Sequence, residues 1–115
     1  MLTVAREMAC PYIRYAHAAA AREAGVRSDI VDGIREKRAM TGLNPDEQAA
    51  VDVARELLRN RKVGLPAFDR ATASFGRRGT LTLTNLVACY AVLAYNMNAY
   101  ELEAPAHATE LALSV

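Results

Sequence analysis

The segment from Thr80 to about Glu103 constrains the fold most strongly, because as a helix it would be apolar on almost every side. A helix without a polar face has to be covered all round, by the other helices of its domain or by a neighbouring subunit. We therefore expect a central helix here, ending near Pro105. Its longest unbroken apolar run, Leu86 to Tyr95, has ten residues, about half of what a membrane-spanning helix needs, so we expect a soluble protein.

Apolar side chains recur at helical spacing in the rest of the chain, between breaks at Gly and Pro. The clearest helix start is Asn44, with Pro45 at the first helical position and Glu47 at the capping-box position. Further helices are predicted over segments 2–9, 11–24, 28–38 and 66–76. No segment shows the alternation of a strand. We expect an all-α fold of five or six helices.

Length and composition limit the class of protein. A chain of 115 residues makes one domain, here 1–115, with 104–115 as a tail. The first helix begins abruptly, without a cap, so we expect it to be the end of a longer, truncated helix. Hydrophobic residues make up 52% against 23% charged, which leaves apolar surface for subunit contacts, and we expect a homo-oligomer.

Charge and motifs exclude several functions. A net charge of +1 is too small for nucleic-acid binding through phosphate contacts. Two cysteines and the lack of a secretory signal favour a reducing cytoplasm over a disulfide scaffold. No His, Cys or carboxylate pair has a metal-ligand spacing, and no glycine-rich phosphate loop follows a strand, so we expect neither a metal nor a cofactor.

The candidate site is a stripe on the helix that begins near Pro11. Cys10, Ile13 and His17 share one helical face, since residues three and four apart lie side by side. A thiol at a helix start is favoured as a thiolate, and an imidazole is the natural acid or base near neutral pH. The two Cα atoms should be about 10 Å apart at 1.5 Å per residue, so a water, a substrate or a group from another helix would have to bridge them.

Simpler interpretations stay open for each of these residues. Cys10 would be a small buried hydrophobe in most proteins, and His17 a core histidine with satisfied hydrogen bonds. Cys89, in the middle of the apolar segment, is expected to be core packing. Arg14 is expected to point to another face of the helix than the stripe.

The order Cys-Pro-Tyr from Cys10, then His17, then an alanine-rich helix ending at Gly25 resembles carboxymuconolactone decarboxylase-like and alkylhydroperoxidase D-like proteins. Segments 44–76 and 83–103 resemble the later helices of that family. The resemblance covers roughly residues 2–103. It implies an all-α, AhpD-like helical fold, assembly into trimers or hexamers, and an active site in a pocket at a subunit contact.

The resemblance also implies roles for the stripe. In the peroxidase branch a Cys-x-x-Cys pair is followed by a His four residues on, and the two cysteines shuttle electrons. Cys10 matches the first cysteine and His17 the histidine, while Ile13 stands where that branch has its second cysteine and other branches have a glutamate.

Three functions follow as hypotheses. The first is a thiol-dependent peroxidase or related oxidoreductase, with Cys10 as nucleophile and His17 as proton handler. The second is a cofactor-free lyase or decarboxylase-type enzyme in which His17 does acid–base work on a small apolar acid or lactone and Cys10 lines the pocket. The third is a non-catalytic oligomer that has kept the frame and lost the site, for which Ile13 is the main indication.

Overall fold

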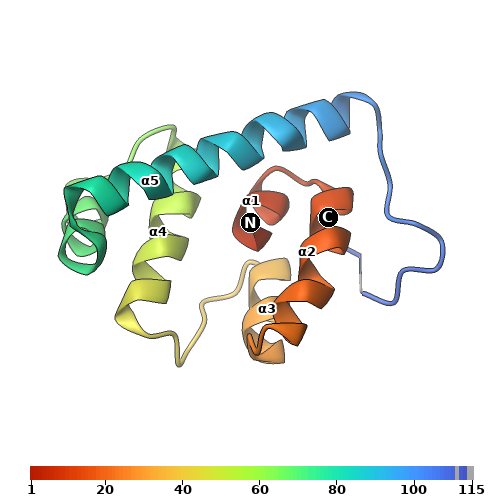
Figure 1. Cartoon of the computed structure of the whole chain (residues 1–115), viewed down its shortest axis with the longest axis horizontal. Coiled ribbons are helices and arrows are strands. Elements are labelled where there is room, and N and C mark those ends of the chain that lie inside the picture. Colours follow the sequence, from red (N-terminus) through yellow and green to blue (C-terminus); the bar gives the residue numbers. More distant parts are fainter. Residues whose placement is uncertain (111, 114–115) are drawn as a thin grey trace.

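The computed structural model describes residues 1–110 and 112–113, and within them every regular element is a helix. The all-α prediction is thus confirmed for this part of the chain, with five helices (Figure 1). They are α1 (Leu2–Glu7), α2 (Pro11–Glu23), α3 (Ser28–Arg35), α4 (Pro45–Asn60) and α5 (Leu65–Ala99).

The helix starts agree with the local sequence signals. At α4 the Asn44 side chain accepts a hydrogen bond from the Glu47 backbone N–H, and the Glu47 carboxylate accepts one from the Asn44 N–H. This is the predicted capping box. α2 begins with a proline, whose missing N–H costs nothing in a first helical turn.

The short helix α1 is the centre of the molecule. Residues 2–6 are all buried, and α1 packs against each of the other four helices. Figure 1 shows α1 in the middle of the molecule. Val4 packs with Ala54 of α4 and Val87 of α5. The core is therefore built around the first helix.

An ion pair fixes α1 to α4. The Arg59 guanidinium donates two hydrogen bonds to the Glu7 carboxylate, at 2.8 and 2.6 Å. Burial raises the pKa of Glu7, but the hydrogen bonds and the positive charge of Arg59, helped by Lys37 and Arg55, outweigh it and hold this pKa below its ordinary value. The contact thus stabilises the fold only while Glu7 is ionised.

The prediction that the segment from Thr80 forms a covered central helix is wrong within one chain. α5 crosses one side of the molecule (Figure 1), and many of its apolar side chains are exposed. The predicted helix 66–76 is the first part of α5. A break at Gly76, where φ is +70° and favours glycine, separates it from the rest of the helix. By length and composition α5 could also cross a membrane, and 17% of its most apolar window is buried. The core helix of a soluble protein, which is mostly buried, passes the same test of length and composition.

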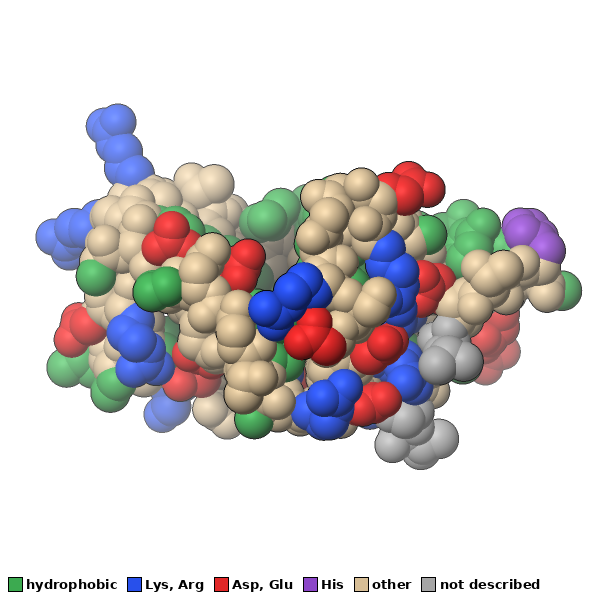
Figure 2. All heavy atoms as spheres, turned by 90° about the horizontal axis from the view of Figure 1, so that it is seen from below, with side chains coloured by type: hydrophobic (Ala, Val, Ile, Leu, Met, Phe, Trp, Pro, Cys, Tyr) green, Lys and Arg blue, Asp and Glu red, His purple; other side chains and the backbone are tan. Residues whose placement is uncertain are grey.

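After α5 the chain forms the predicted tail, which returns to α2. Arg22 donates to both carboxylate oxygens of Glu110 and also to Asp32 of α3. Figure 2 shows the lower side of the molecule, where acidic and basic side chains are interspersed over the surface. The tail is thus fixed to α2 and α3 by a charged contact, with residues 111, 114 and 115 outside the described part.

Candidate functional site

Cys10 lies at the predicted helix start. It is the N-cap of α2, with an extended backbone, and its carbonyl accepts a hydrogen bond from the Arg14 N–H at 3.2 Å. The side chain makes no capping hydrogen bond and has 0% exposure. It packs with Ala5 of α1 and Ala94 of α5. The thiol is thus closed off from solvent between α1 and α5.

Ile13 belongs to the same cluster and is only 2% exposed. It fills the space between α2 and α5 together with Cys10 and Ala94. A carboxylate at this position would be removed from water without a partner, which costs several kcal/mol. Isoleucine therefore makes the stripe more apolar than a cysteine or glutamate would.

His17 is the third member and is half-buried. Its ring meets the ring of Tyr90 edge to face, with centroids 5.5 Å apart and an interplanar angle of 81°. Burial lowers the pKa of His17, and the positive charge of the Met1 amino group lowers it further. The imidazole is therefore neutral at pH 7 and able to accept a proton.

The structure places the whole stripe against α5, but it does not join the two reactive groups. Cys10 and Ile13 contact Ala94, and His17 contacts Tyr90 one turn earlier on α5. Among the described residues no hydrogen bond links the thiol to the imidazole. The bridge between them predicted from the spacing would have to come from a substrate, from water or from Tyr90.

Tyr90 is a site residue that sequence reasoning missed. The sequence shows it only as one position of the apolar segment from Thr80. The signal that could have suggested this contact was its place on the apolar segment predicted to be covered by other helices, but its pairing with His17 depends on how α2 and α5 cross.

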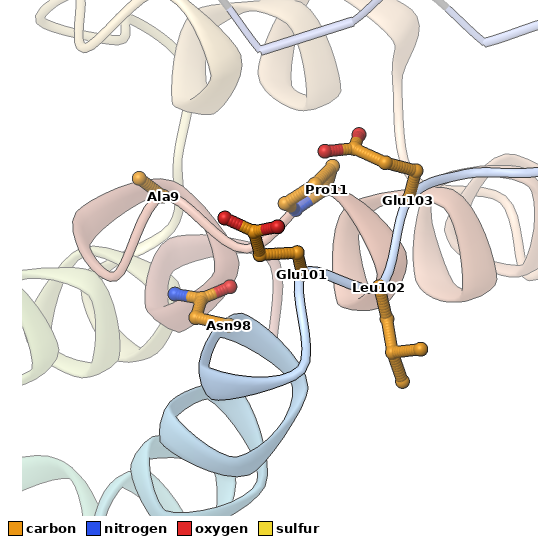
Figure 3. A pocket seen from close by; sticks show the side chains of 6 residues that line it. All are labelled: Ala9, Pro11, Asn98, Glu101, Leu102 and Glu103. Atoms are coloured by element: carbon orange, nitrogen blue, oxygen red, sulfur yellow. The ribbon is translucent and has the colours of Figure 1, made fainter.

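A cavity of about 500 Å³ opens beside Cys10 (Figure 3). It is lined by Ala9, Pro11, Asn98, Glu101, Leu102 and Glu103. The Asn98 amide donates to the Met8 carbonyl at 2.7 Å and so attaches the end of α5 to the turn before Cys10. In Figure 3 the carboxylates of Glu101 and Glu103 lie near Pro11, whereas Leu102 points away. The cavity reaches Ala9 and Pro11 on either side of Cys10, whereas the Cys10 side chain is buried in the core.

Arg14, expected on another face of the helix than the stripe, is buried although it is not part of the apolar cluster. Its side chain is only 3% exposed and faces Glu110 of the tail. The spacing of four residues from Cys10 was the available signal, because it places Arg14 beside Cys10 on the helix surface.

Cys89 is exposed, so its predicted role in core packing is wrong. Both cysteines are free. In the described part of the chain, no group of three or more His, Cys, Asp or Glu side chains could hold a metal ion.

No family model, no curated protein and no solved structure matches this chain.

Proposed function

We propose that this chain is a carboxymuconolactone decarboxylase-like enzyme in which His17 transfers protons to and from a small apolar acid or lactone. The observation that carries the proposal is the state of His17, the one half-buried member of a stripe whose other two members are buried. Burial, and after it the charge of the Met1 amino group, lower the pKa of His17 and so favour its neutral form. A neutral imidazole is a competent general base near neutral pH.

In this mechanism the imidazole removes a proton from the substrate and returns it to the developing product. The Tyr90 ring meets the imidazole edge to face and limits its orientation. Cys10 and Ile13 of the same stripe are buried against Ala94 of α5 and make the surroundings apolar. Apolar surroundings favour a substrate with little charge away from the reacting atoms.

A thiol-dependent peroxidase is the second candidate, favoured by the place of Cys10 at the N-terminus of the 13-residue helix α2. A thiolate would attack the peroxide O–O bond, giving a sulfenic acid and an alkoxide that takes up a proton as the alcohol, with His17 as proton handler. An external thiol would then reduce the sulfenic acid. This function requires the α2–α5 contact to open, because the thiol has no exposed surface.

We also propose that copies of the chain associate through α5 into a trimer or hexamer. Large apolar side chains stay exposed along this helix after the chain has folded. They include Leu81, Leu86, Val92, Leu93 and Tyr95. Contact with a second copy would remove these apolar side chains from water, as the apolar pattern of α5 predicts. Leu86→Glu and Val92→Glu should therefore lower the mass measured by light scattering, whereas Leu65→Glu at the start of α5 should not.

Two single variants separate the catalytic hypotheses. If His17 does the chemistry, His17→Ala abolishes turnover of a panel of small carboxylated lactones and Cys10→Ala retains most of it. If Cys10 is the nucleophile, Cys10→Ala abolishes reduction of cumene hydroperoxide by dithiothreitol. Cys89→Ala is the matched cysteine control and should change neither activity. Inactivity of the wild type in both assays would favour the non-catalytic oligomer.

A thiol titration adds a measurement that needs no substrate. In a Cys89→Ala background the only remaining thiol is that of Cys10. Slow labelling in the native protein and fast labelling in urea are expected from its burial. Fast native labelling at pH 7 would instead favour the peroxidase.

A further inference from the structure

The most unusual polar group in the molecule is the guanidinium of Arg14. Its side chain is 3% exposed, and within residues 1–110 and 112–113 none of its three nitrogen atoms has a hydrogen-bond partner. The nearest counter-charge is Glu110, whose Oε2 lies 3.5 Å from Nη2, beyond an ordinary hydrogen bond. Burial lowers the pKa of Arg14, and the Glu110 charge opposes this only in part.

The Glu110 carboxylate is engaged elsewhere. Arg22 donates to both of its oxygens, at 2.8 and 3.1 Å. The tail therefore supplies Arg14 with a nearby negative charge but leaves the donors of its guanidinium free for another acceptor. A buried cation in this state costs free energy that a hydrogen-bonded anion would recover.

Arg14 lines a cavity of about 290 Å³ between α2 and the tail. The apolar part of the lining consists of Pro11, Ala104, Pro105, Ala108, Ala112 and Leu113. At about 30 Å³ for each non-hydrogen atom, taken from the volume of water, it holds roughly ten such atoms. Glu103 and Glu110 also line it, and their charges repel a dianion about twice as strongly as a monoanion.

We propose that this cavity binds a small monocarboxylic acid with an apolar body, whose carboxylate accepts hydrogen bonds from the Arg14 guanidinium. The planar guanidinium matches a carboxylate through two parallel hydrogen bonds. The apolar lining contacts the body of the acid, and the two glutamates select against dianions. The site goes beyond the proposed function, since it requires neither His17 nor Cys10.

Benzoate is the probe, because it has one carboxylate on an apolar ring and fits the volume. Calorimetric titration of the full chain should show saturable binding of benzoate and at least tenfold weaker binding of benzamide, which has the same shape without the charge. Inorganic phosphate should also bind at least tenfold more weakly than benzoate. Equal affinity for benzoate and benzamide, or tighter binding of phosphate, would overturn the proposal without any variant.

Variants of Arg14 then test whether its guanidinium binds the carboxylate. Arg14→Gln should weaken benzoate binding at least tenfold, and Arg14→Lys, which keeps the charge but not the paired donors, should weaken it less. Arg70→Gln, an exposed arginine of α5, is the matched control and should bind like wild type. His17→Ala should also keep its affinity, so failure of the proposed catalytic function would leave this result intact. Wild-type affinity in a folded Arg14→Gln protein, with folding checked by circular dichroism, would contradict the assignment.

Discussion

Replacing Ile13 with alanine tests how much the packing of the stripe against α5 stabilises the fold. The substitution removes three carbon atoms from a side chain that is 2% exposed. At about 0.8 kcal/mol for each buried carbon the transfer loss is about 2.4 kcal/mol. The space left between α2 and α5 adds a cavity cost, so the free energy of unfolding should fall by about 3–4 kcal/mol. This is a large part of the ~5–15 kcal/mol of a typical domain.

Urea unfolding followed by circular dichroism measures this loss. Leu65→Ala is the control, because Leu65 is 70% exposed and its truncation should cost no more than about 0.5 kcal/mol. In a Cys89→Ala background, Ile13→Ala should also speed labelling of Cys10, since both side chains belong to one cluster. A loss below about 1 kcal/mol, or equal to that of the control, would refute the packing of the stripe against α5.

Three further predictions concern other parts of the fold. Asn44→Ala removes the capping box of α4 and should lower the free energy of unfolding by about 1 kcal/mol, whereas Asn44→Asp should restore most of it in the same urea assay. Arg59→Gln leaves the Glu7 carboxylate without its partner and should lower the free energy of unfolding by about 1–3 kcal/mol at pH 7. Because the pKa of Glu7 in the folded chain is lowered, this loss should shrink as the pH falls below about 4.5. A loss that does not depend on pH would count against the Glu7–Arg59 pair. Because the pKa of His17 is lowered in the folded chain, the unfolded chain takes up a proton on His17 at a higher pH than the folded chain does. The stability of the wild type should therefore fall as the pH drops below about 6.5, and His17→Gln should flatten this dependence. Parallel curves for the two proteins would show that His17 is not desolvated.

Local features of the fold could be predicted from the sequence because each depends on a few neighbouring residues. The Asn44 capping box, the start of α2 at Pro11 and the break at Gly76 are all of this kind. The sharing of one face by Cys10 and Ile13 also follows from helix geometry alone.

The surroundings of the site could not be predicted, because they depend on residues far away in the chain. Tyr90 meets His17 across the α2–α5 contact, and Glu110 approaches Arg14 only because the tail returns to α2. The exposure of Cys89 has the same origin. An apolar helix can be covered by its own chain or by another, and its sequence is the same in both cases.

The central position of α1 affects the order in which the chain can fold during synthesis. The carbonyl of Met8, just after α1, accepts a hydrogen bond from the Asn98 side chain, 90 residues later. At the usual ~5–20 residues per second, α1 must wait roughly 5 to 20 seconds for that partner to be made. During this time its apolar side chains are without the cover of α5, and the core closes only when α5 has left the ribosome.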